Sequence, residues 1–473
     1  MKKAIKIFCM YLVTMLVFCH LPSQVLAEET LLDFAEAWQK LATDSDTLAA
    51  SRERLDQARH KKDAARDLYL PEIEISASYM RLDDEVTLSP SDILSSMPAG
   101  DRLAPFIEQI GRSYGFYGAA LNTAFTSTIA ERENRASSIR GSWPIYAGGR
   151  IDAAQDIAAG QEKEADKKLE MTGQEQFENL VRYYFGAVLA SQVYQTKGEV
   201  AEGLAKHVKH ALLLERQGQI AKVERIQAEA AYDKAKVEHR KAGRDLEINR
   251  LALTRLLKMS EMVTPADALF IRDTLPPLET FLKDTLERAP GLDILKAKRD
   301  QAAGLVAVEE GKYYPTVALF GNYSLYEEDD LANKMLPDWV LGIGVKMPLL
   351  ERSGRSGNLQ AAKSVIRQLD YLQSQARSDL GVLVEKTYRQ AEQALEEYQG
   401  LSSSLKLAEE TVSLRSKSFD QGLSTSLDVV DAQMFLAGIK TQRAGAVYSY
   451  VLALAKLLVV SGRMETFFKY QLP

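Results

Sequence analysis

Two segments of the chain alternate apolar and polar residues in the manner of amphipathic strands. From Glu72 to Tyr79, isoleucine, alanine and tyrosine alternate with glutamate and serine, and a similar alternation runs from Thr316 to Tyr326. Because successive side chains of a strand point to opposite faces, each segment is predicted to be a strand with one apolar face. A returning strand is predicted after each of them, at 136–146 and at 339–349.

Long helical patterns follow both pairs of strands. No proline occurs in 150–263 or in 354–462, and both segments are rich in Ala, Glu, Lys, Gln and Leu. The turn signals Gln217-Gly218 and Gln421-Gly422 divide each segment into a hairpin, whose first helix of about 67 residues would be roughly 100 Å long. Helices of this length predict rod-like hairpins packed as in a coiled coil. The start of the mature chain, 30–67, is also predicted to be helical.

The same elements occur twice along the chain. Tyr-Leu-Pro71 and Tyr-Tyr-Pro315 open the two first strands 244 residues apart, whereas the glycines of the turns, Gly218 and Gly422, are 204 apart. Two registers that hold over such distances indicate a duplicated unit. The difference between these two spacings predicts that the segment 80–125 between the first pair of strands is about 40 residues longer than its counterpart. A segment that varies so much in length is expected to be an exposed loop that tolerates insertions. Its prolines are expected to break regular structure there.

The first residues have the pattern of an export signal. Three lysines precede an apolar stretch of about 13 residues, and Val25-Leu26-Ala27 is a small-residue cleavage site. Cleavage after Ala27 would remove both cysteines of the chain, Cys9 and Cys19, so the mature protein is expected to contain no disulfide or cysteine–metal site. The formal charge of −6 would fall to about −9, which argues against a nucleic-acid partner. No apolar segment long enough for a transmembrane helix is expected beyond the signal.

This pattern divides the chain into four parts. They are a signal peptide at 1–27, a first structural repeat at 28–263, a proline-rich linker at 264–290 and a second structural repeat at 291–473. Each repeat supplies an entry helix, two strands and one long helical hairpin.

Four amphipathic strands are too few to close a barrel, which needs about eight, and open strand edges are costly in lipid. The chain is therefore predicted to oligomerise. Aromatic residues near the strand ends fit the interfaces of a membrane barrel. They are Tyr69, Trp143, Tyr146, Tyr313, Tyr314 and Trp339. A soluble β-sandwich fused to coiled coils is the alternative that these observations favour less.

Three motifs resemble the TolC family of outer-membrane efflux proteins. They are Tyr-Leu-Pro71, Pro144-Ile-Tyr-Ala-Gly-Gly-Arg150 and Gly422-Leu-Ser-Thr-Ser-Leu-Asp-Val-Val-Asp-Ala-Gln433, and the resemblance extends over about 33–462. It implies a mixed α and β membrane protein, a homotrimer with a twelve-stranded β-barrel continued by a periplasmic α-helical coiled-coil tunnel. It also implies an exit duct in the outer membrane for drugs, metals or secreted polypeptides. Its partners would be a periplasmic adaptor (membrane fusion) protein and an inner-membrane pump of the RND or ABC type.

Charged residues near the two hairpin turns are candidates for a periplasmic gate. The resemblance matches Asp428 and Asp431, which lie on one helical face, to the family's acidic residues at the periplasmic constriction. The alternative for Asp428 is a helix cap, because Thr425-x-x-Asp428 is a capping-box pattern. The first copy has Glu224 at the place of Asp428, beside Lys222 and Arg225, which are either surface charges or bridges to neighbouring hairpins.

The turns themselves are the candidate site for docking an adaptor. The residues are Gly218, Ile220, Gly422, Leu423 and Ser424. Both glycines are expected in the left-handed conformation of a helix end. Ile220 and Leu423 are apolar side chains with no obvious core to fill.

No catalytic, metal or cofactor site is predicted. His207 and His210 are one helical turn apart, but the sequence offers no third ligand. No nucleophile–base arrangement is apparent, so the chain is not expected to be an enzyme. The alternative to a passive duct is a periplasmic structural or scaffold protein built of helical rods.

Overall fold

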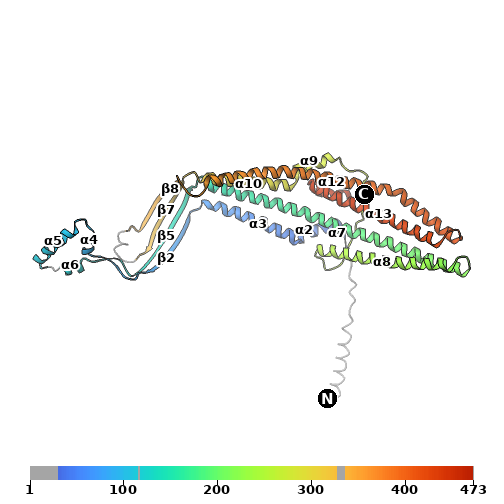
Figure 1. Cartoon of the computed structure of the whole chain (residues 1–473), viewed down its shortest axis with the longest axis horizontal. Helices are drawn as coiled ribbons and strands as arrows, with labels where there is room; N and C mark the ends of the chain where they lie inside the picture. The colour runs from blue at the N-terminus through green and yellow to red at the C-terminus, as the bar shows by residue number, and fades with distance from the viewer. Residues whose placement is uncertain (1–29, 116–117, 328–335, 472–473) are drawn as a thin grey trace, which may run out of the picture. The chain divides into compact units, whose positions relative to one another are not determined.

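A computed structural model describes residues 30–115, 118–327 and 336–471 of the chain (Figure 1). The signal peptide predicted at 1–27 lies outside the described residues. The chain divides into two compact units, each of which combines segments of both predicted repeats. The first unit comprises 30–56, 164–296 and 371–471, and the second comprises 57–163 and 297–370.

A four-stranded antiparallel sheet lies in the second unit (Figure 1). Its order is β2 (Glu72–Arg81), β5 (Glu133–Tyr146), β7 (Thr316–Tyr326) and β8 (Trp339–Lys346). All four strands had been predicted from their alternation, although β5 begins three residues earlier and β8 ends three residues earlier than expected. Both outer strands, β2 and β8, have one edge that no described strand of the chain pairs.

The register of the sheet separates an apolar face from a polar one. Ile75 pairs with Ile139, Ile139 with Tyr323 and Tyr323 with Trp339, so one apolar row crosses all four strands. Ile75 and Trp339 are exposed, because nothing in the described part of the chain covers this row.

The neighbouring row, on the opposite face, is polar. Arg140 Nη1 lies 3.4 Å from Glu74 Oε1, and the Oγ atoms of Ser76 and Ser138 are 3.1 Å apart. The sheet therefore has the two-faced chemistry of a wall between lipid and water.

Gly342 of β8 makes room for an aromatic ring on this second face. A Cβ atom at Gly342 would lie 2.6 Å from Cζ of Phe320, its partner on β7, which is too close for any other residue without a shift of the ring. Gly342 thus has a packing reason inside a strand.

The segment between β2 and β5 is folded, so the expectation that regular structure is broken there was wrong. Its elements are β3 (Val86–Leu88), α4 (Pro90–Ser96), α5 (Gly100–Ser113), α6 (Gly118–Ala124) and β4 (Ser127–Ala130). The prolines were misread. Pro90 occupies the first turn of α4, where its missing N–H has no helical partner to lose, and Ser89 with Asp92 forms a capping box before it.

The two long hairpins are present as predicted. They consist of α7 (Arg150–Arg216) with α8 (Lys222–Leu256), and of α12 (Arg355–Asp420) with α13 (Ser426–Val460). The first helices have 67 and 66 residues, and the second helices have 35 residues each. The near-equal lengths confirm the duplication.

Shorter elements connect the hairpins to the sheet and to each other. They are α2 (Phe34–Asp44), α3 (Asp46–Arg66), η1 (Asp67–Tyr69), α9 (Leu278–Arg288), α10 (Pro290–Gly311), η2 (Met464–Thr466) and α14 (Phe467–Gln471). The predicted entry helix is wrong at its start. Thr30–Leu32 is a strand, β1, which pairs in parallel with β6 (Val263–Pro265).

Helix α13 is long and apolar enough, by composition, to cross a membrane, so the expectation that no such segment follows the signal was wrong. Its apolar residues instead fill the core of the first unit. Of its most apolar window 56% is buried inside the chain, and Tyr450, Val451 and Leu454 are fully buried there with Phe177 and Phe185 of α7. Burial against other helices is the ordinary reason for such a composition in a packed protein.

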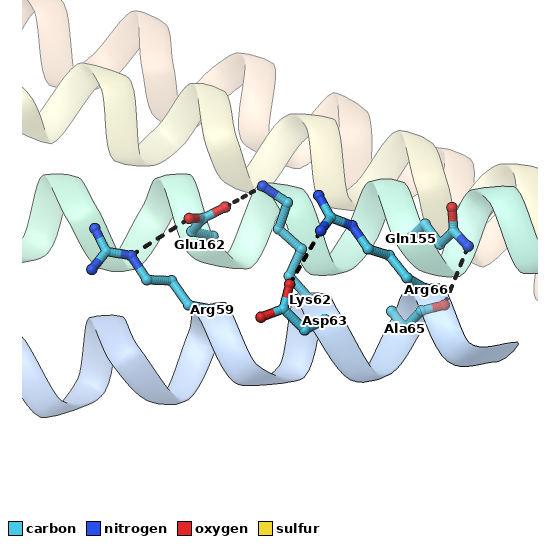
Figure 2. Close-up of polar contacts among 7 residues, drawn as sticks. All are labelled: Arg59, Lys62, Asp63, Ala65, Arg66, Gln155 and Glu162. Atoms are coloured by element: carbon cyan, nitrogen blue, oxygen red, sulfur yellow. Dashed lines mark hydrogen bonds and ion pairs between the residues drawn. The ribbon is translucent and has the colours of Figure 1, made fainter.

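Ionic contacts fasten α3 to α7 in the second unit (Figure 2). Lys62 Nζ is 2.6 Å and Arg59 Nε 3.7 Å from the carboxylate of Glu162, and Gln155 donates to the carbonyl of Ala65 at 3.3 Å. The hydrogen bond from Lys62 holds the pKa of Glu162 below its usual value. The contribution of this contact to stability is therefore present above the ordinary pKa of glutamate and is lost as pH falls through the lowered one.

Tyr184 of α7 joins three distant segments in the core of the first unit. Its buried hydroxyl lies 2.9 Å from the carbonyl of Leu32 and 2.8 Å from Oδ2 of Asp267, and it accepts from the amides of Ala266 and Asp267 at 3.2 Å. Asp267 in turn accepts from the amide of Phe34 at 2.8 Å. One hydroxyl thus fixes the linker between the repeats against β1 and α7.

Replacing Tyr184 by Phe should lower the stability of the protein by about 1–3 kcal/mol, because the partly buried amide of Asp267 loses its acceptor. The measurement is the midpoint of thermal unfolding, followed by circular dichroism of the purified protein. Tyr183→Phe is the matched control, since this neighbouring ring is exposed. Equal midpoints for the two variants would contradict the role assigned to the Tyr184 hydroxyl.

Candidate functional site: the hairpin tips

The two turns of the long hairpins are built alike. Gly218 and Gly422 have φ of 73° and 69°, the left-handed conformation expected for both. The amide of Gln219 donates to the carbonyl of Leu214 at 2.8 Å, and 204 residues later the amide of Leu423 donates to that of Ser418 at the same distance. The repeat therefore extends to individual hydrogen bonds.

Asp428 is fully engaged as a helix cap. Its Oδ2 accepts from the amide and the hydroxyl of Thr425, at 2.9 and 2.7 Å, and from the hydroxyl of Ser424 at 3.1 Å. Thr425 Oγ1 accepts in return from the amide of Asp428, which completes a capping box at the start of α13. The hydrogen bonds from Thr425 hold the pKa of Asp428 below its usual value, with a smaller effect from Arg415. Asp428 is therefore ionised in neutral and mildly acidic solution.

Asp431, one turn further along α13, lies in a different environment. It is exposed and lines a cavity of about 160 Å³ together with Lys197, Lys234 and Glu238. Within the described part of the chain it takes part in no hydrogen bond or ion pair. Of the acidic pair, only Asp431 has a carboxylate that is not committed to a structural contact.

The first copy lacks the cap of the second copy. Ala221 stands where Thr425 stands in the second copy, and it makes no side-chain capping bond. Glu224 consequently reaches across to the other hairpin, where its Oε2 accepts from the amide of Ser426 at 2.7 Å. A residue of the first hairpin thus caps a helix of the second.

The two basic candidates beside Glu224 make no contact between hairpins in the described residues. Arg225 binds Glu215 and Glu229, and both partners belong to its own hairpin. Lys222 is exposed at the first position of α8.

Four buried residues, one from each long helix, pack together near the turns and form what we call the tip core. They are Ala211, Ala228, Phe419 and Val429. Ile220 packs against this tip core, so the view that it has no core to fill was wrong. Leu423, in contrast, is 76% exposed, and Ser424 serves the cap of α13.

Sequence reasoning considered His207 and His210 only as metal ligands and missed that both contact the second hairpin. His207 Nε2 is 2.7 Å from Ser426 Oγ, and His210 Nδ1 is 3.1 Å from Asp420 Oδ1. No group of three ligands suited to a metal occurs in the described residues. A usable signal existed in the spacing, because His207 continues the buried series of Val200, Leu204 and Ala211 on α7 at alternating intervals of four, three and four.

The aromatic candidates occupy both ends of the sheet in the second unit. Trp143 Nε1 donates to the carbonyl of Tyr69 at 2.8 Å, and the Tyr69 hydroxyl donates to Asp152 at 2.8 Å. Arg355 lies over the ring of Tyr313, 4.8 Å from its centroid. Tyr146 and Tyr314 are exposed at this same end, and Trp339 is exposed at the opposite end.

A family model described as "Outer membrane efflux protein" matches residues 37–257 and 281–463. The chain belongs to the outer membrane efflux protein family. The family resemblance that the sequence motifs indicated is confirmed.

Known relatives of this outer membrane efflux protein agree with the assignment. Nodulation protein T of Rhizobium leguminosarum bv. trifolii is 30% identical over 183 residues, which are 36% of this chain and only 37% of that protein. The outer membrane protein VceC of Vibrio cholerae matches with a TM-score of 0.68 at 14% identity, over 90% of this chain and 95% of its own. The MtrE outer membrane channel of Neisseria gonorrhoeae matches with a TM-score of 0.71 at 16% identity, over 91% and 89%. The predicted fold class is therefore confirmed as that of outer-membrane channels.

Proposed function

We propose that this protein is the outer-membrane exit duct of a tripartite efflux or type I secretion system. It would passively conduct what an inner-membrane pump delivers through a periplasmic adaptor. The observation that carries the proposal is the four-stranded sheet, whose apolar face is uncovered and whose two edges are unpaired among the described residues. Such a sheet needs further strands and a lipid environment to be stable.

Three copies of the chain meet both needs. Twelve strands close a barrel in which β8 of one copy pairs with β2 of the next, so that no edge is left. The row of Ile75, Ile139, Tyr323 and Trp339 then faces lipid, and the polar row that contains Glu74 and Arg140 faces the aqueous lumen. The aromatic residues at the two sheet ends lie at the membrane interfaces. The long hairpins form the periplasmic tunnel, and their tips face the adaptor.

The decisive experiment is to locate and size the assembly. The full chain, expressed in a Gram-negative host, should appear in the outer-membrane fraction and run as a trimer on gels unless the sample is boiled. Purified protein should conduct ions in a planar bilayer. A soluble periplasmic protein without conductance would instead support the scaffold alternative.

The exposed residue Leu423 should be part of the adaptor dock, together with the turn at Gly218 and Ile220. Leu423→Asp should reduce export on the order of tenfold or more, because a few residues carry most of the energy of an interface and a charge in a desolvated contact is costly. Export is measured in cells that supply the matching adaptor and pump, and trimers are measured in the same membranes. Leu407→Asp, a change at an exposed leucine of α12 away from the turn, is the control and should export normally. Normal export by Leu423→Asp would place the dock elsewhere.

Asp431 should set the ion preference of the periplasmic entrance. Three copies around an axis bring three such carboxylates together, and a ring of this kind attracts cations and repels anions. Asp431→Asn should therefore lose most of the cation selectivity in single-channel recordings, and high salt should screen the effect in the wild type. Asp428 is a poor choice for this test because its replacement also removes the cap of α13.

The control for this test is Asp233→Asn, which removes the same charge from an exposed position of α8. It should keep the wild-type reversal potential. Unchanged selectivity in Asp431→Asn would mean that Asp431 is an ordinary surface charge.

A further inference from the structure

One residue of the second hairpin is held by both helices of the first. Ser426, the first residue of α13, is fully buried. Its hydroxyl lies 2.7 Å from Nε2 of His207 on α7, and its amide donates to Glu224 on α8 at 2.7 Å. These two bonds join the hairpins at the point where the tip core ends.

The imidazole of His207 lies in an enclosed site. It is 6% exposed, and its ring packs against Phe419 of α12 with the ring centroids 4.4 Å apart. The charged groups around it are His210 on its own helix, Asp420 on α12 and Glu224 on α8. On α13 it faces the amino-terminal end, where the helix dipole is positive and where Asp428 is already engaged in the cap.

We propose that His207, Ser426 and Glu224 form a proton-operated latch between the two hairpins, which acidic solution releases. Neutral imidazole fits the enclosed site and completes the contact with Ser426. A proton on His207 places a positive charge in a site with little water, beside the positive end of α13. Protonation therefore raises the free energy of the latched arrangement relative to one in which the hairpin tips are apart and the imidazole is hydrated. The consequence for transport, an easier opening of the periplasmic end, rests on the proposed function.

The sign of the effect follows from the burial of the ring. Burial lowers the pKa of His207, and nearby His210 lowers it further, while Asp420 and Glu224 act in the opposite direction. A released, hydrated imidazole regains a pKa of about 6.5 and takes up the proton more readily. The latch is therefore fully effective above that value and weakens as pH falls through it toward the lowered pKa of the latched state. The pair of His210 and Asp420 is half exposed on both sides, and exposed pairs contribute little.

The direct test measures the distance between the two hairpin tips. The chain has no cysteine after residue 19, so the variant Gln219→Cys with Leu423→Cys gives the mature protein two unique labelling sites, one in each turn. Labelled chains are co-produced with an excess of unlabelled wild-type chains, and spin–spin distances are recorded at about pH 8 and about pH 5.5. We expect a shift toward longer distances at the acidic pH.

Variants identify the group that is responsible. His207→Gln keeps an N–H group that can reach Ser426 but cannot gain charge, so it should abolish the acid shift. His210→Gln is the matched control and should retain it. Ser426→Ala removes the hydroxyl partner while Thr425 still caps α13, and it should populate the longer distances already at about pH 8. An acid shift that persists in His207→Gln, or no shift in the wild type, would overturn the proposal.

Conductance separates this proposal from the one on which it rests. In a planar bilayer, the open probability of the wild type should rise several-fold on acidification of the periplasmic side, and that of His207→Gln should stay constant. Channels that conduct but show no difference between these two proteins contradict the latch alone. Protein that never conducts, yet still shows the acid shift in distance, contradicts the duct and leaves the latch standing.

Discussion

The rest of this structure depends on the outer edges of β2 and β8, which no described strand of the chain pairs. A backbone N–H or C=O group without a partner costs several kcal/mol in lipid, and one chain supplies too few strands to remove its own edges. Closure by further copies satisfies these groups and at the same time gives the apolar row of the sheet its cover. In the assembly that we propose, closure also brings equivalent hairpins around one axis, where Asp431 of each copy would contribute to a ring. The grouping of charged residues at the hairpin tips would therefore result from the need to pair the edges of the sheet.

The two repeats share a backbone but differ in the side chains that end their helices. The hydrogen bonds of the two turns recur at a spacing of 204 residues, whereas Thr425 corresponds to Ala221. Loss of the capping hydroxyl leaves Glu224 without a local partner, and the amide of Ser426 supplies one from the other hairpin. A symmetrical pair of capped turns would have no such link. The difference between the two copies thus accounts for one of the contacts that join the hairpins.

Elements with a local cause were predictable from the sequence. Alternation predicted the four strands, the absence of proline predicted the hairpins, and Thr425-x-x-Asp428 predicted the cap that the structure contains. Elements with a distant cause were not. Thr30–Leu32 is a strand only because residues 263–265 lie beside it, and the burial of His207 depends on Phe419 and Ser426 of the other hairpin.

Two errors had a different origin, because the local signals were present and were misread. Prolines in the segment after β2 were taken as breakers, although Pro90 follows the helix-starting Ser89. The apolar composition of α13 was passed over, although the structure uses it to fill a core. Both cases show that position within an element decides the meaning of a residue: proline in the first turn starts a helix, and apolar residues on every face of a helix indicate burial.

Two ionisable groups at the tip, Asp428 and His207, change charge at different pH as the solution becomes acidic. Hydrogen bonds from Thr425 keep Asp428 ionised well into the acidic range, so its negative charge is fixed under mild acidification. Burial keeps His207 neutral while the latch is closed, so the charge that changes under mild acidification is the positive charge that His207 gains as the latch opens. A fixed carboxylate at the cap preserves the start of α13 while the contact between hairpins weakens. The helix can then move as an intact body, because the group that holds its end together and the group that holds it to its neighbour titrate in different ranges of pH.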